Sequence, residues 1–144
     1  MSANTRFPVA VHIMTALAYR DGESISSPLL AKSVRTNPVV IRRALRELRA
    51  KGLVEAQPGA GGGSRLTRRP ESITLLDIFR AVGPLSPFSL PNKAEVKTCA
   101  VSCAMRKLLS SVLADTDRAI ARSLEAVRLS DLVQRVGEAE KLPR

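Results

Sequence analysis

Hydrophobic residues recur at every third or fourth position along most of the chain, which is the pattern of amphipathic helices. The stretches with this pattern predict helices over residues 8–20, 28–34, 38–51, 75–82, about 102–127 and 130–136. Residues 53–57 and 64–68 alternate in polarity on either side of a glycine-dense turn, which predicts an antiparallel β-hairpin. The predicted fold class is therefore mainly α, with one small hairpin.

Capping residues and prolines mark where several of these helices begin. Pro8 suits a first helical position, and the pairs Ser27-Pro28 and Asn37-Pro38 each join a capping side chain to a first-turn proline. Thr74 and Asp77 form a capping box before the fourth helix. Because the second and third helices are separated by a very short link, they predict a helix-turn-helix, and the hairpin that follows is its wing.

The third predicted helix has two chemically different faces. Four apolar residues at helical spacing predict a core-facing side, and these are Ile41, Ala44, Leu45 and Leu48. The opposite side carries Val39, Arg42, Arg43, Arg46 and Arg49. Arginine can bond a guanine edge through two hydrogen bonds, and an exposed valine can contact a thymine methyl group. The amino end of the second helix, at Ser27, can meet a phosphate.

Charge is distributed unevenly along the 144 residues, whose net charge is +10. Residues 1–70 hold 12 basic and 4 acidic side chains, whereas residues 71–144 hold 11 and 9. A concentrated positive field favours a polyanion as partner. The chain has three Phe, one Tyr and no Trp, too few for the stacking surfaces of single-strand or RNA binders, so double-stranded DNA is favoured. The alternative is a solvated basic face with no ligand.

The C-terminal third predicts a connector and a long helix that needs a partner surface. Residues 84–101 contain three prolines and no helical period, so we expect a connector there. The long helix carries an apolar stripe that we assign to homodimerisation: Leu108, Leu109, Val112, Leu113, Ile120, Leu124 and Val127. The alternative is that this helix folds back on its own domain.

The expected organisation has three parts. Residues 1–83 form the DNA-binding domain, 84–101 the connector, which also serves as a sensor loop, and 102–144 the long dimerisation helix and a C-terminal tail that frays from Gly137. No run of about 18 apolar residues and no export leader is visible, so we expect a soluble, cytoplasmic protein without a membrane partner.

Two segments together resemble the Rrf2 family of bacterial winged-helix transcription regulators. They are SVRTNPVVIRRALRELRAKGLVEAQPGAGGG (33–63) and RRPESITLLDIFRAV (68–82). The resemblance implies a homodimer on a pseudo-palindromic promoter site, with the third helix in the major groove and the wing beside it. It implies groove contacts by Thr36, Asn37, Pro38, Val39, Arg42 and Arg43, and wing contacts by Gly62, Ser64 and Arg65.

The family also includes sensors that hold an iron-sulfur cluster through three connector cysteines. Here the connector region offers only Cys99 and Cys103, so a cluster would need a histidine, a carboxylate or the other protomer, and we expect no cofactor. A second interpretation is a redox switch, because the helix dipole and nearby cations would favour the Cys103 thiolate. The alternative is two small hydrophobic residues without a signalling role.

These observations predict a DNA-binding repressor that responds to thiol oxidation, another stress signal or a small-molecule effector. Two alternatives stay open: a regulatory subunit that chiefly binds a metabolic enzyme, and an iron-sulfur sensor. We do not expect an enzyme, because one histidine and two neighbouring cysteines supply no catalytic set or metal centre.

Overall fold

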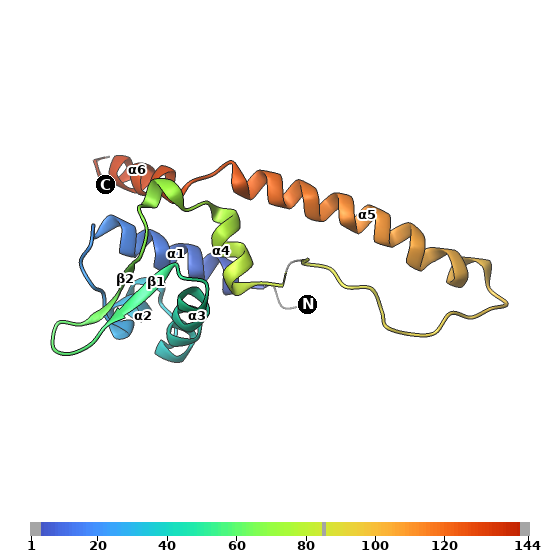
Figure 1. The fold of residues 1–144 in the computed structure, drawn as a ribbon, viewed down its shortest axis with the longest axis horizontal. Coiled ribbons are helices and arrows are strands. Elements are labelled where there is room, and N and C mark those ends of the chain that lie inside the picture. Colours follow the sequence, from blue (N-terminus) through green and yellow to red (C-terminus); the bar gives the residue numbers. More distant parts are fainter. Residues whose placement is uncertain (1–3, 85, 142–144) are drawn as a thin grey trace.

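The computed structural model describes residues 4–84 and 86–141, and these residues form a small helical body with one long projecting arm (Figure 1). The elements are α1 (Arg6–Tyr19), α2 (Ser27–Val34), α3 (Pro38–Ala50), β1 (Val54–Gln57), β2 (Gly63–Leu66), the 3-10 helix η1 (Pro70–Ser72), α4 (Leu75–Val82), α5 (Ala100–Glu125) and α6 (Leu129–Glu140). The predicted mainly helical class with one antiparallel hairpin is confirmed.

The core lies where α1, α3 and α4 meet. All four residues predicted on the inner face of α3 are buried, and they pack in one cluster with Ile13, Leu17 and Ile78. Each fully buried aliphatic side chain contributes about 1.5–3 kcal/mol relative to exposure. Packing against the core therefore decides how α3 is rotated about its own axis.

The turn between α2 and α3 is held by backbone and capping hydrogen bonds. Arg35 adopts a left-handed conformation, and the next amide, of Thr36, donates to the carbonyl of Ala31 at 3.0 Å. The side-chain oxygen of Asn37 accepts from the amide of Val39 at 2.9 Å, with Pro38 as the first helical residue. The predicted start of α3 is confirmed, and the turn fixes it relative to α2.

Two predicted helix starts are wrong by one or two residues. The N-cap of α2 is Ser26, and Ser27 is already helical. Helix α1 begins at Arg6 rather than Pro8. A proline fits inside the first turn because the amides there have no helical acceptor.

The hairpin is also bound to a segment outside its two strands, the loop before α2. Strands β1 and β2 pair antiparallel from Val54 opposite Leu66 to Gln57 opposite Gly63. Ser64 also exchanges two backbone hydrogen bonds, both 2.9 Å, with Ile25 in the loop before α2. Because of this bridge, the wing is fastened to the loop that begins the helix-turn-helix.

The connector after α4 runs out from the body, α5 leads the chain back to it, and α6 lies beside α1 (Figure 1). Leu129, the first residue of α6, is fully buried in the common core. The Tyr19 hydroxyl donates to Glu140, and this hydrogen bond and the carboxylate charge raise the pKa of Tyr19. The fraying predicted from Gly137 is wrong for residues 137–140, which are helical; residues 142–144 of that tail lie outside the described residues.

None of the described helices has the length and apolar character needed to cross a bilayer.

We predict that Gly63→Ala loosens the hairpin anchor. An added Cβ would lie 2.3 Å from the carbonyl oxygen of Ile25 and 2.7 Å from the amide nitrogen of Ser26, and both are main-chain atoms. We expect the free energy of unfolding in urea to fall by about 2–3 kcal/mol. Gly137→Ala is the control, because nothing lies within 4 Å of its added Cβ and α6 gains a better helix former, with a rise of about 0.5–1 kcal/mol. An unchanged midpoint for Gly63→Ala would contradict the anchor.

Candidate nucleic-acid interface

The outer face of α3 carries a stripe of three exposed arginines. Arg42, Arg46 and Arg49 follow one another at helical spacing on the side opposite the buried residues. Within residues 4–84 and 86–141, none of the three forms an ion pair or a side-chain hydrogen bond with the rest of the chain. Their guanidinium groups are therefore available to a ligand.

The stripe faces a groove of about 920 Å³ between α3, the start of α2 and the hairpin. Six of the residues predicted to contact DNA line this groove: Ser27, Val39, Arg42, Arg43, Arg46 and Ser64. The groove thus brings together groups from three elements that are separate in the sequence. Its cationic wall and open mouth suit a phosphate-bearing polymer.

Several of the predicted contacts also have visible structural roles. Thr36, Asn37 and Pro38 form the turn and cap that start α3. Gly62 closes the hairpin, since a Cβ there would lie 2.2 Å from the carbonyl oxygen of Gln57. Ser64 is buried and contributes its backbone to the Ile25 bridge. For each of these residues, contact with DNA stays a prediction.

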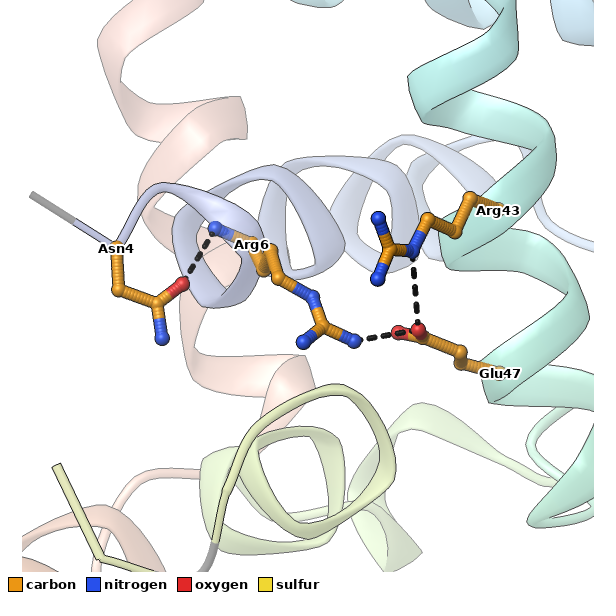
Figure 2. Close-up of polar contacts among 4 residues, drawn as sticks. All are labelled: Asn4, Arg6, Arg43 and Glu47. Atoms are coloured by element: carbon orange, nitrogen blue, oxygen red, sulfur yellow. Dashed lines mark hydrogen bonds and ion pairs between the residues drawn. The ribbon is translucent and has the colours of Figure 1, made fainter. Parts of the chain in front are cut away.

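Two glutamates that the sequence analysis did not select contact predicted DNA-binding arginines. Figure 2 shows the carboxylate of Glu47 facing a terminal guanidinium nitrogen of Arg6 from α1 and the Nε of Arg43 from α3. The Arg43 Nε lies 3.6 Å from Glu47 Oε1, and Arg6 forms an ion pair with the same oxygen. On the hairpin, Arg65 forms an ion pair with Glu55, its cross-strand partner.

The sequence carried a signal for part of this arrangement. Positions 43 and 47 have the i, i+4 spacing of a helical ion pair, and the hairpin register places 55 opposite 65. Arg6 is 41 residues from Glu47, so only the packing of α1 against α3 reveals it.

Comparison with known proteins identifies the family. The Rrf2 model, described as an iron-dependent transcriptional regulator, matches residues 3–135. This chain belongs to the Rrf2 family. It is 30% identical over 130 residues to YwnA of Bacillus subtilis, which is named as an HTH-type transcriptional regulator, with 90% of this chain and 96% of YwnA covered. It is 30% identical over 118 residues to the HTH-type transcriptional regulator CymR of the same species, with 81% and 86% covered.

Solved structures agree with this assignment. The structure of CymR, titled the global cysteine regulator of B. subtilis, aligns with a TM-score of 0.68 at 27% identity over 94% of this chain and 98% of that one. T. potens IscR aligns with a TM-score of 0.74 over 100% and 93%, and at 23% identity it supports the fold. The winged-helix prediction is confirmed, and these relatives carry the names of transcriptional regulators.

The cysteines of this Rrf2 protein lie at the start of α5. Cys99 is the N-cap, and Cys103, one turn on, directs its thiol at the carbonyls of Val96 and Lys97 at 3.6 and 3.9 Å. Both are exposed and free. Among the described residues, no three His, Cys, Asp or Glu side chains gather as metal ligands, and His12 lies in α1, 2.9 Å from the Ser33 hydroxyl. Two thiolates from one chain do not complete the ligand set of an iron-sulfur cluster.

The predicted dimerisation stripe lies on α5, which projects from the body (Figure 1), except for Val127. Val127 comes after the end of α5 at Glu125, so its predicted place on the long helix is wrong. No residue of α5 is buried, and Leu108 and Val112 are 60% and 57% exposed. Leu109 is also exposed, whereas the other residues of the stripe, nearer the body, are half-buried: Leu113, Ile120, Leu124 and Val127. The body has its own open apolar surface, a cleft of about 1230 Å³ between α1, α2 and α6 that includes the exposed Leu29 and Val136.

We predict that Arg35→Gly stabilises the Rrf2 domain. Arg35 has φ 61° and ψ 49°, a conformation that disfavours residues with a Cβ and suits glycine. After the greater flexibility of glycine in the unfolded chain is deducted, the gain is about 0.5–1 kcal/mol, measured as a higher thermal midpoint.

The matched control is Arg35→Ala, which removes the same charge but keeps the Cβ and should show no gain. Equal midpoints for the two variants would show that the left-handed backbone is not strained.

Proposed function

We propose that this Rrf2 protein is a transcriptional repressor that binds a pseudo-palindromic duplex as a homodimer in the cytoplasm. The observation that carries the proposal is the stripe of Arg42, Arg46 and Arg49, which is exposed, without protein partners among the described residues, and part of one groove with the start of α2 and the hairpin. Helix α3 enters the major groove, and the hairpin follows the adjacent backbone.

Each group in the groove has a chemistry that suits DNA. Arg42 and Arg46 can each make two hydrogen bonds to a guanine edge, and the exposed Val39 can contact a thymine methyl group. The first turn of α2, beginning at Ser27, offers free backbone amides to a phosphate. Base contacts and backbone contacts together read a sequence and fix the register.

The homodimer follows from the exposed arm. Leu108 and Val112 are apolar, and within the described residues nothing of the same chain covers them. A second copy is the simplest partner, because two-fold dimers are the commonest oligomers. The chain exposes both an apolar arm and an apolar cleft, and a two-fold dimer contains two of each, so apolar surface of one protomer can be covered by the other. Dimers of this class read two half-sites about one helical turn apart.

Oxidation of Cys99 and Cys103 is the signal we propose. A peroxide can take two electrons and two protons from the two thiols, so that a disulfide forms and hydrogen peroxide becomes two waters. The residues are one turn apart, a separation that a disulfide can span. The bond would remove the Cys103 thiol from the carbonyls of the connector.

We predict that Arg42→Ala and Arg46→Ala each weaken binding to the preferred sequence. The wild type first selects a duplex of about 30 base pairs from a random pool, and fluorescence anisotropy then measures affinity for that duplex. Loss of a two-bond guanine contact lowers affinity by about 5–150-fold.

The control for this test is Arg80→Ala, which removes an exposed charge from α4 outside the groove. The proposal fails if the wild type binds all duplexes equally at fixed salt, or if Arg80→Ala is as damaging as the groove variants. Stoichiometric capture of a metabolic enzyme by a wild type without duplex preference would favour the enzyme-binding alternative.

We predict that Leu108→Asp combined with Val112→Asp gives a folded monomer. Both side chains are more than half exposed in the single chain, so the substitutions leave the core intact but place charge in the proposed interface. Sedimentation should show the wild type as a dimer and the variant as a monomer, with unchanged circular dichroism. Ser111→Asp, on the same helix, is the charge control and should remain dimeric. A dimeric double variant would place the interface elsewhere.

A further inference from the structure

Acidic side chains are almost missing from the segment that carries the proposed DNA surface. Between residues 24 and 70 there are ten Lys and Arg and only two acidic residues, Glu47 and Glu55. Each of the two forms an ion pair with an arginine of that surface, Glu47 with Arg43 and Glu55 with Arg65. Neither belongs to the core, so their positions call for an explanation other than packing.

Glu47 is the more firmly placed of the two. Its side chain is 23% exposed, against 62% for Arg43, and one carboxylate oxygen serves both Arg43 and Arg6. The backbone amide of Arg6 donates to the side chain of Asn4 at 3.1 Å, as Figure 2 shows. The carboxylate is therefore bound by Arg6 of α1 as well as by Arg43, and Arg43 is the most exposed member of the group.

Glu55 repeats the arrangement on the hairpin. It lies directly opposite Arg65 in the strand register, and the Arg65 Nε donates to its carboxylate. Both side chains are partly exposed. An incoming phosphate must therefore compete with a carboxylate for Arg43 on the recognition helix and for Arg65 on the wing.

We propose that Glu47 and Glu55 are specificity-determining residues that weaken non-specific DNA binding by holding Arg43 and Arg65. The inference rests on the proposed function. Exchanging a partly exposed carboxylate for a phosphate gains little, because both partners are screened anions. On the preferred duplex, Arg42 and Arg46 supply the base contacts and fix the register. Arg43 and Arg65 therefore stay paired with their glutamates there. The two glutamates therefore lower affinity for random duplex more than for the preferred one.

The test compares Glu47→Gln with wild type on a random-sequence duplex and on the duplex that the wild type selects. We expect random-duplex affinity to rise about 3–10-fold and the plot of log affinity against log salt to steepen by about 0.9, the value for one added phosphate contact. Affinity for the selected duplex should change less than about twofold, so discrimination falls. Glu55→Gln should act in the same direction.

A matched control separates this effect from simple loss of negative charge. Glu23 pairs with Arg20 at 3.5 Å outside the acid-poor segment, and Glu23→Gln should leave the salt slope unchanged. A rise in random-duplex affinity equal to that of Glu47→Gln would overturn the inference.

A double variant tests whether Glu47 acts through its arginine. In the Arg43→Gln background, Glu47→Gln should give no further gain, because no guanidinium is left to release. A gain of the same size as in the wild type would overturn the proposal and indicate general repulsion. Should Glu47→Gln unfold, the Glu55→Gln and Arg65→Gln pair gives the same comparison on the hairpin.

Failure of the proposed function and failure of the inference give different results in these experiments. If the wild type selects no sequence, the proposed function fails and the inference with it. If the wild type is selective but Glu47→Gln and Glu55→Gln match Glu23→Gln, only the inference fails.

Discussion

Burial of the apolar face of α3 is the constraint on which the candidate DNA interface depends. Ile41, Leu45 and Leu48 are packed in the common core, and successive helical residues are about 100° apart, so this packing fixes where Arg42, Arg46 and Arg49 point. A slip of one residue would turn the stripe away from the groove. The direction of α3 is set independently, by the left-handed turn before it and the Asn37 cap. Recognition geometry is thus a consequence of core packing.

The wing is positioned by a second constraint that lies outside the hairpin. The backbone of Ser64 pairs with that of Ile25, and Gly63 permits these two backbone segments to approach closely. The same loop leads directly into α2, whose first turn lines the groove. The hairpin and the start of α2, which line two sides of the groove, are therefore connected by the Ile25–Ser64 bridge. The hairpin cannot move far without disturbing the start of α2. This connection explains how three short elements form one surface.

Local patterns predicted what local forces decide. The two faces of α3, its Asn37 cap and the capping box of α4 follow from spacing and side-chain chemistry, and the structure has all of them. The Ile25 bridge and the Arg6–Glu47 pair join segments about 40 residues apart, so no window of sequence contains them. Helix α6 extends to Glu140 because its first residue, Leu129, is buried in the core and Glu140, in its last turn, accepts a hydrogen bond from the Tyr19 hydroxyl. The core residues and Tyr19 that hold α6 are far from it in the sequence.

The base of α5 decides what the arm can transmit to the DNA surface. Backbone hydrogen bonds join the amide of Leu75 to the carbonyl of Val127 at 2.9 Å and the amide of Leu129 to the carbonyl of Ile73 at 2.8 Å. These bonds tie the end of the arm to the segment between the hairpin and α4, close to the core that orients α3. At about 1.5 Å per residue, the 26 residues of α5 extend about 39 Å from this joint. In the proposed dimer, a small rotation at the joint would therefore change the spacing of the two α3 helices. A signal received at Cys99 and Cys103, at the far end of α5, must then reach the DNA surface through this joint.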